Sequence, residues 1–483
     1  MDTGGAGLRR SQLIMSLVHP CCSGVQVEDG SRSIHLGSVM SKNLVDQIPA
    51  SPKLLILAIQ HLLAMYAGAV TVPLVLASAL HLGPDDTAYL VSSDLIACGF
   101  VTLLQCIGFG PVGVRLPVIM GVTFVSVGPS IAIASNPSLG LPGIFGATIV
   151  SGILGVFIAP IFSRLSSLFA PVVTGTAMLL IGISLMGVAV NWISGAPGAG
   201  QGEPWGLALA ALVVATILIV IRFGRGFIAN TAILLGIIGG FVLASAAGKV
   251  DFGHVATANW FSLVSPLHFG PPRFDLAAII SMTIVMLITM VESSGMLFAL
   301  GRIVERPVTA SDLARGLRAD AFGALIGGFF NSLPYTSYSQ NVAIVSMTGV
   351  RSRYVCAMTG VLLILLGAVP KLSYLVTAIP PPVLGGAAIV LFGMVAANGV
   401  LALGQIDFIA DRRRLYVVAV GLGVGLIPNI DPHFFDRLPT AISGYLHNGV
   451  MLGILATIIL NLALKASDTD LAPASVLATE PAN

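Results

Sequence analysis

Polar side chains inside apolar runs are the residues of this sequence that could do chemistry. Glu292 lies in the middle of SMTIVMLITMVESSGMLFALG, and Gln340 and Asn341 follow the segment LPYTSYS. Burial disfavours the charged form of a carboxyl, so Glu292 could hold and release a proton near neutral pH. The two amides offer donors and acceptors that suit the edge of a planar heterocycle. Glu292 is therefore a candidate substrate ligand, proton carrier or both; the alternative is a carboxyl that only ties two helices together.

Other candidate residues allow two interpretations from their positions alone. Asp320 follows a basic loop and opens the run AFGALIGGFF, so it is either a functional carboxyl or a helix N-terminal charge favoured by the dipole. His61 lies in the first apolar run, where a lone histidine is more often a packing residue than a ligand. The rings of Phe124, Tyr335 and Tyr338 could stack on a flat substrate, although such rings usually serve packing.

The composition places these residues in a membrane protein. Hydrophobic residues make up 56% of the chain, charged residues 9%, and the mean hydropathy is +0.96. Soluble domains do not reach these values. Many apolar runs are about 20 residues long, enough to cross about 30 Å of hydrocarbon. A polar segment at that depth must be buried in protein or line a water-filled cavity.

Several function classes are excluded by what the sequence lacks. The net charge of +2 gives no reason to expect a nucleic-acid partner, and the five cysteines have neither metal-ligand spacing nor a disulfide framework. No phosphate-binding loop, nucleophile elbow or metal motif is present. We therefore expect a protein that is not an enzyme and that has no metal and no cofactor. We expect its transport to be either driven by an ion gradient or passive.

From Lys53 onward the sequence predicts an all-α membrane protein of fourteen segments in two halves of seven. The third segment of each half is broken, because LPVIMGVTF and LPYTSYSQN both open with Leu-Pro. The predicted segments are 54–76, 86–107, 116–136, 142–162, 168–190, 204–221 and 227–247, then 276–299, 315–331, 333–348, 354–373, 377–401, 414–428 and 446–465.

The distribution of basic residues predicts the orientation of the chain in the membrane. With the N-terminal tail inside, cytoplasmic loops hold thirteen arginines, whereas outside loops hold only Lys249, Arg273, Lys371 and Arg437. Cytoplasmic loops of membrane proteins carry the excess of Lys and Arg. We therefore expect both termini in the cytoplasm and a multi-pass protein of the cytoplasmic (inner) membrane.

The two halves resemble each other. PVVTGTAMLLIG at 171–182 matches PVLGGAAIVLFG at 382–393, and the two Leu-Pro segments place Thr123 opposite Gln340 and Phe124 opposite Asn341. A half with seven segments must insert opposite to its copy. Inverted repeats with broken segments near the midplane are typical of carriers. Chance similarity between small-residue helices is the alternative.

With these residues in place, the chain resembles the nucleobase–ascorbate transporter family, also called nucleobase:cation symporter-2. The family motif is Gln, Glu or Pro, then Asn-x-Gly-x-x-x-x-Thr, then Arg, Lys or Gly. Residues 340–349, QNVAIVSMTG, match it except at Ala343, where the motif has Gly. The dipeptide QH at 60–61, VESSG around Glu292 and LRAD ending at Asp320 are further matching landmarks. The resemblance covers about residues 53–465.

The resemblance implies a core domain and a gate domain, usually in a homodimer. Core segments would occupy 53–163 and 276–375, and gate segments 164–275 and 376–466, between a tail at 1–52 and a tail at 467–483. Movement of the core against the gate would carry the substrate like an elevator.

The resemblance also implies roles for individual residues. Glu292 and Gln340 would contact the base, helped by backbone at Phe124 and Ser339. His61 would tune the site, and Asp320 and Asn341 would be essential. The coupling ion would be a proton held by Glu292 or Asp320.

The implied substrates are oxopurines, because Gln340 resembles the xanthine and uric acid branch, whereas uracil carriers tend to have Glu there. Thr123 and the 28-residue spacing from Glu292 to Asp320 look more like uric acid carriers. Xanthine, or both, stays open, as does another nucleobase such as uracil. An anion carrier of the sulfate-permease type on the same fold is a further alternative, and a receptor or scaffold without transport another.

Overall fold

The computed structural model describes residues 44–164, 171–195, 202–431, 433–437, 446 and 448–464. Almost all of these residues lie in helices or in the turns between them. The predicted tails, 1–52 and 467–483, fall largely outside the described residues.

Several helices begin where the sequence offers a proline or a capping side chain. The helices α1 (Ser51–Ala79), α2 (Pro84–Ile107) and α6 (Pro204–Phe223) each have proline within their first two positions, where the missing N–H is not needed. Helix α11 (Ala310–Phe329) begins with a capping box, in which the Thr309 side chain accepts from the Asp312 N–H and the Asp312 carboxylate accepts from the Thr309 N–H.

The remaining elements follow in chain order. Before residue 250 they are η1 (Leu44–Asp46), β1 (Met120–Val122), η2 (Phe124–Ser126), α3 (Val127–Ala134), α4 (Gly140–Arg164), α5 (Pro171–Ser194), α7 (Phe227–Asn230) and α8 (Ala232–Ala246). After residue 250 they are α9 (Gly253–Thr257), α10 (Leu276–Ile303), β2 (Tyr335–Ser337), α12 (Ser339–Thr348), α13 (Arg353–Gly367), α14 (Pro370–Thr377), α15 (Pro381–Leu403), α16 (Arg412–Ile430) and α18 (Gly449–Ala463).

The prediction of a helical membrane protein is confirmed. Within the described residues, eight helices are long and apolar enough to span a bilayer, and a ninth span results if α13 and α14 count as one. The predicted segment 354–373 is not a straight helix, because α13 and α14 meet at a bend of 80°. The cause is Pro370, since the residue before a proline avoids the helical conformation.

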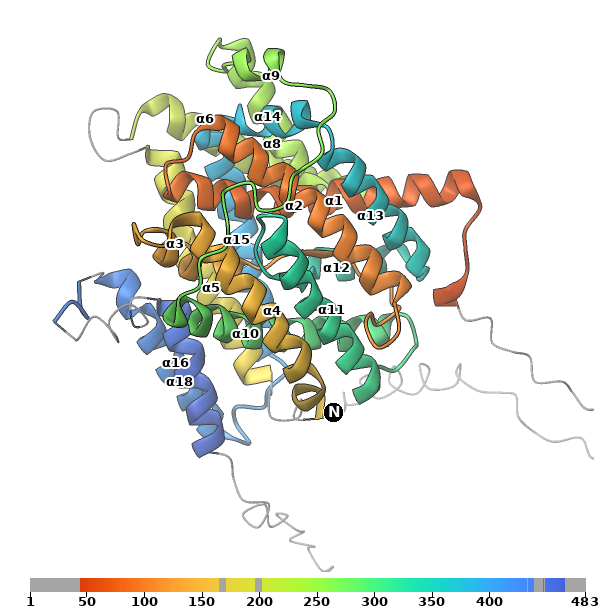
Figure 1. Cartoon of the computed structure of the whole chain (residues 1–483), viewed down its shortest axis with the longest axis vertical. Helices are drawn as coiled ribbons and strands as arrows, with labels where there is room; N and C mark the ends of the chain where they lie inside the picture. Colours follow the sequence, from red (N-terminus) through yellow and green to blue (C-terminus); the bar gives the residue numbers. More distant parts are fainter. Residues whose placement is uncertain are drawn as a thin grey trace, which may run out of the picture. The chain divides into compact units, whose positions relative to one another are not determined.

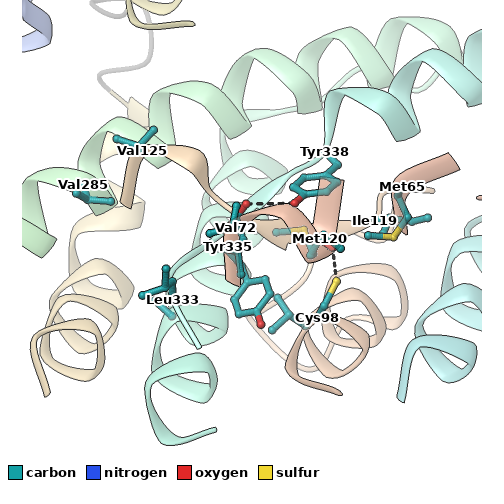
Figure 2. Close-up of a cluster of buried hydrophobic side chains, with 14 of the residues drawn as sticks. Met65, Val72, Cys98, Ile119, Met120, Val125, Val285, Leu333, Tyr335 and Tyr338 are labelled. Carbon is teal, nitrogen blue, oxygen red and sulfur yellow. Dashed lines mark hydrogen bonds between the residues drawn. The ribbon is translucent and has the colours of Figure 1, made fainter. Parts of the chain in front are cut away.

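The two broken segments meet as short antiparallel strands. Met120 of β1 pairs with Ser337 of β2, and Val122 pairs with Tyr335. Figure 2 shows the side chains of Met120, Tyr335 and Tyr338 gathered at this strand crossing. Two half-spans that end in strands leave backbone groups unpaired, and pairing with each other satisfies them away from lipid. The prediction of extended stretches in segments 3 and 10 is therefore confirmed.

Helices from the two halves pack together around the strands. The most extensive pairings join α5 to α15, α4 to α11, and α2 to α13 (Figure 1). Small residues allow these approaches: a Cβ on Gly99 of α2 would collide with the backbone oxygen of Gly360 in α13. Such close packing at small residues is the usual way in which helices associate in membranes.

Candidate substrate site

Glu292 lies in α10, next to the residue that hydrogen-bonds to the strand crossing. The next residue, Ser293, accepts a hydrogen bond from the Ser337 N–H at 3.1 Å and shares another with the Thr336 hydroxyl at 3.1 Å. These bonds fix β2 against α10 one residue away from Glu292. The Thr123 hydroxyl donates to Glu292 Oε2 over a long 3.5 Å, so the other broken segment also reaches this carboxyl.

A small cavity borders the carboxyl. Its volume is about 20 Å³, a little more than a water molecule needs. Residues from the strand crossing, α5, α10, α12 and α15 line it: Phe124, Val125, Met178, Ile181, Glu292, Thr336, Tyr338, Ser339, Gln340, Val395 and Asn398. Four residues predicted to contact substrate, Glu292, Gln340, Phe124 and Ser339, therefore share one cavity.

Gln340 and Ser339 form the first turn of α12, which opens at the cavity. The Ser339 hydroxyl donates to Gln340 Oε1 at 3.4 Å, and Tyr338 precedes them without a side-chain cap. The first N–H groups of a helix have no intrahelical partner, so this turn offers backbone donors as well as the amide. It can therefore donate to a carbonyl and accept from a ring N–H.

Phe124 enters the cavity from the other broken segment. Its ring meets the Phe392 ring of α15 edge to face, with centroids 5.7 Å apart. Tyr338 also lines the cavity, and its hydroxyl donates to the Val122 carbonyl at 3.2 Å. Tyr335 is fully buried on the other side of β2, away from the cavity (Figure 2). Of the three aromatic candidates, only Phe124 and Tyr338 are placed to stack on a ligand.

His61 and Asn341 lie behind the cavity rather than in its lining. His61 Nδ1 is 3.1 Å from Asn341 Oδ1, and Asn341 Nδ2 donates to the Pro117 carbonyl at 2.9 Å. Both side chains are buried. They join α1, α12 and the segment that leads into β1, so their contacts hold the two broken segments together.

Asp320 is buried in α11 and also lies outside the cavity lining. Its Oδ1 accepts from Gln105 Nε2 at 3.2 Å. Gln105 in turn accepts from the Val114 N–H at 2.9 Å, which fixes the turn before β1. Asp320 thus sits well inside its helix, and the interpretation as an exposed helix-end charge does not fit its burial.

Sequence reasoning missed Asp94, a buried carboxyl in α2. Its Oδ1 accepts from the Tyr335 hydroxyl at 2.8 Å and from the Ser332 hydroxyl at 2.9 Å. The signal was available, since Asp94 interrupts the apolar run YLVSSDLIACGFV. Asn398 was also missed, although it interrupts the apolar run of α15 and lines the cavity. Within the described residues, no group of three His, Cys, Asp or Glu side chains could hold a metal ion.

Comparison with solved structures identifies the fold. The transmembrane domain of a cyanobacterial bicarbonate transporter, BicA, superposes with a TM-score of 0.52 at 14% identity, covering 83% of this chain and 96% of that one. At this identity the likeness concerns the fold alone. Together with the apolar spans, it defines a multi-pass membrane protein with the fold of that transmembrane domain.

Sequence comparison identifies the family. The family model Xan_ur_permease, described as Permease family, matches residues 52–434. The chain belongs to this permease family, which confirms the resemblance drawn from the motif and makes the protein a transporter rather than an enzyme.

Characterised relatives are similar over most of their length. The uric acid transporter UacT of Escherichia coli (strain K12) is 48% identical over 419 residues, which cover 86% of this chain and 87% of UacT. The xanthine permease of Bacillus subtilis (strain 168) is 43% identical over 411 residues, which cover 85% of this chain and 93% of that permease.

Proposed function

We propose that this protein takes up oxopurines, uric acid or xanthine or both, together with protons across the cytoplasmic membrane. The observation that carries the proposal is the shared cavity of Glu292 and Gln340 at the strand crossing. The names of the relatives, a uric acid transporter and a xanthine permease, support the substrate class.

The cavity has the chemistry that an oxopurine needs. Such a ring is flat and presents N–H groups next to carbonyls along its edge. The Gln340 amide can pair with both, and the Glu292 carboxyl can accept from a ring N–H through its carbonyl oxygen. Phe124 and Tyr338 border the same space and offer faces for stacking. Thr123 would act through Glu292, to which it donates.

The position of Glu292, on α10 beside the strand crossing, supports proton coupling. A carboxylate inside a membrane protein is costly unless it is paired or protonated. The protonated carboxyl would donate to a purine carbonyl and accept from a ring N–H, so the proton and the purine would occupy the site together and leave it together. Proton and substrate binding would then be linked at one carboxyl.

The packing pairs support an inverted repeat. A twofold axis in the membrane plane would exchange α4–α11 with α13–α2 and would map the α5–α15 pair onto itself, and these pairs are the most extensive ones. The sequence register that matches Thr123 with Gln340 also matches Met120 with Ser337, three residues earlier in each half. These two residues pair in the sheet, as such an axis requires.

The cavity lining supports movement of a core against a gate. Phe124, Glu292 and Gln340 belong to the proposed core, whereas Met178 and Asn398 belong to the proposed gate segments α5 and α15. A purine is several times larger than the water-sized cavity, so binding requires the two sides to separate. A second cavity, of about 210 Å³, adjoins the first at Phe124. It extends along α3 and α5 to the end of α16 and the start of α18. It would serve as an access route.

Residues behind the cavity would act by positioning. His61 and Asn341 would keep α12 in register with the first broken segment, and Asp320 would do the same for the turn before β1 through Gln105. Asp320 remains a second candidate for the coupling proton. We further propose a homodimer with both termini in the cytoplasm.

Uptake of radiolabelled urate and xanthine by cells that express the protein tests the proposal. We expect saturable uptake that a protonophore abolishes and that excess unlabelled purine blocks. A membrane-inserted protein that moves neither purine but moves uracil or an inorganic anion would overturn the substrate assignment. Saturable uptake that resists the protonophore would overturn proton coupling alone.

A further inference from the structure

Helix α1 presents a position without a side chain to the helix that carries Gln340. Gly68 lies seven residues after His61 in α1, so the two positions share one face of the helix. His61 meets Asn341 on this face. Gly68 faces Gln340, because a Cβ built on Gly68 would lie 3.8 Å from Gln340 Nε2. The two neighbouring amides of α12 therefore meet two different positions of α1.

The backbone at Gly68 does not require glycine. Gly68 is buried in the middle of a 29-residue helix and has no positive φ. Glycine in a helix interior is less favourable than alanine, because its backbone loses more freedom on folding. A Cβ at this position would meet Tyr338 Cε2 at 3.4 Å, an ordinary van der Waals distance, so one carbon fits there but a large side chain does not. The absent side chain thus leaves a small space beside Tyr338 and Gln340.

The Gln340 amide has one occupied end and one free end. Its Oε1 accepts from the Ser339 hydroxyl at 3.4 Å, whereas its Nε2 has no hydrogen-bond partner among the described residues. Gln340 lines the cavity at the strand crossing. An amide nitrogen only donates, so Nε2 suits a carbonyl of a purine and not a ring N–H. Because Gly68 has no side chain, it offers Nε2 no competing acceptor.

We propose that Gly68 is a specificity-determining residue, which leaves Gln340 Nε2 free to donate to one carbonyl of a bound purine. The inference rests on the proposed function, since it concerns how the same cavity chooses among purines. A site with a free donor discriminates against an analogue that lacks the matching carbonyl, because the donor then stays unpaired. Gly68→Ser would place a hydroxyl one bond beyond the Cβ, within hydrogen-bonding reach of Nε2, and would occupy that donor.

Competition binding to the purified full chain tests this role. Labelled xanthine is displaced by unlabelled xanthine, by hypoxanthine, which lacks the C2 carbonyl, and by 2-hydroxypurine, which lacks the C6 carbonyl. The discrimination ratio is the dissociation constant of an analogue divided by that of xanthine. The analogue with the larger ratio in the unchanged chain identifies the carbonyl that Nε2 meets. The proposal predicts that one of the two ratios is well above one.

Three substitutions at Gly68 separate hydrogen bonding from volume. In Gly68→Ser, affinity for xanthine should fall by about two- to ten-fold and the larger ratio should approach one, because a neutral hydrogen bond is lost. Gly68→Cys has a larger side chain but a weaker acceptor, so it should lower the ratio less than Gly68→Ser does. Gly68→Ala adds a carbon without an acceptor and should keep the ratio. The matched control is Gly423→Ser in α16, where a Cβ would meet no atom within 4 Å.

A double-mutant cycle with Gln340→Ala shows whether the effect passes through the amide. Gln340→Ala alone should lower the larger ratio, since the donor is gone. Adding Gly68→Ser should then change neither the ratio nor the affinity for xanthine further. All variants should elute as monodisperse protein. If Gly68→Ser does not fold, the comparison of Gly68→Cys with Gly68→Ala gives the same test, since only the cysteine should lower the ratio.

Several outcomes would overturn the role of Gly68. An unaltered ratio in monodisperse Gly68→Ser, or a loss that is larger in Gly68→Cys than in Gly68→Ser, would leave the proposed function standing but remove this inference. An equal loss of affinity in the Gln340→Ala background would do the same, because the effect would not pass through the amide. If the unchanged chain binds neither xanthine nor urate, the proposed function itself fails and the role of Gly68 fails with it.

Discussion

Glu292 and Asp94 are both carboxyls inside apolar helices, yet their surroundings differ. Asp94 accepts hydrogen bonds of 2.8 and 2.9 Å from two hydroxyls, on the side of β2 that faces away from the cavity. Glu292 borders the cavity, where its Oε2 accepts from the Thr123 hydroxyl over a long 3.5 Å and the Thr336 hydroxyl also interacts with the carboxyl. Burial alone therefore does not mark a candidate binding carboxyl, and the number of donors does not either, since Asp94 Oδ2 is buried without a partner among the described residues. The difference is that Glu292 lines the cavity and Asp94 does not.

The strongest test of this difference is neutralisation of Glu292. Glu292→Gln keeps the side-chain volume and an acceptor oxygen but cannot take up or release a proton, so proton-coupled uptake should stop. The amide alters one neutral hydrogen bond to the purine, worth about 0.5–1.5 kcal/mol, so purine affinity should fall by no more than about ten-fold. Uptake per membrane-inserted protein measures the effect. Uptake equal to that of the unchanged chain would contradict the assignment.

Asp94 should respond in the opposite way. Asp94→Leu removes the carboxylate acceptor of the Tyr335 and Ser332 hydroxyls, which keep only each other and the Asp94 main-chain carbonyl, 3.2 Å from the Tyr335 hydroxyl. We expect a cost of about 1–3 kcal/mol in total. The melting temperature and the amount of inserted protein should therefore fall, whereas the KM of the surviving protein should stay close to its original value. Asp94→Asn is the control, because its Oδ1 still accepts. A large rise in KM with unchanged stability would make Asp94 a binding residue.

A smaller disturbance can be placed in the strand crossing itself. A Cβ on Gly121 of β1 would collide with the Tyr338 ring, which lines the cavity. Gly121→Ala should therefore displace that ring and reduce uptake by about ten-fold, on the order of 1.4 kcal/mol. Adding Tyr338→Leu should relieve the collision and restore part of the uptake. An unaffected single variant would show that the crossing adapts without cost to substrate binding.

The smallest effect is expected on the gate side. Asn398 of α15 lines the cavity opposite Glu292's helix and offers one neutral amide. Its loss should cost about 0.5–1.5 kcal/mol, a rise of about two- to ten-fold in KM. Competition between unlabelled purines and labelled substrate in Asn398→Ala measures this rise. Loss of all transport would indicate that the gate residue, rather than Glu292, dominates recognition.

Much of this arrangement could be predicted from the sequence because membranes restrict the choices. Apolar length predicted a helical membrane protein, and the Leu-Pro repeats predicted the two broken segments; the structure confirms both, whereas the count of fourteen segments stays a prediction. The bend at Pro370 was also readable, since proline disfavours helix in the residue before it. The family resemblance grouped Glu292, Gln340, Phe124 and Ser339, and the structure places these four residues around one cavity. Their contact with substrate stays a prediction.

Side-chain direction was harder to predict. Gln340 and Asn341 are neighbours in sequence, but successive helix residues differ by about 100°, so the first borders the cavity and the second bonds to His61. The contact between His61 and Asn341 joins residues 280 positions apart, which local pattern cannot predict. Asp94 was overlooked although it interrupts an apolar run; what the sequence does not show is that its partners, Ser332 and Tyr335, lie in a distant segment.

The central claim is that Glu292 carries a proton together with the purine, and proton flux tests it most directly. Purified protein is reconstituted in vesicles that contain a pH-sensitive dye, and urate or xanthine is added outside without any imposed gradient. The account predicts substrate-dependent acidification of the interior, absent in Glu292→Gln and present in Asp94→Asn. Purine entry without acidification, or acidification that persists in Glu292→Gln, would contradict it.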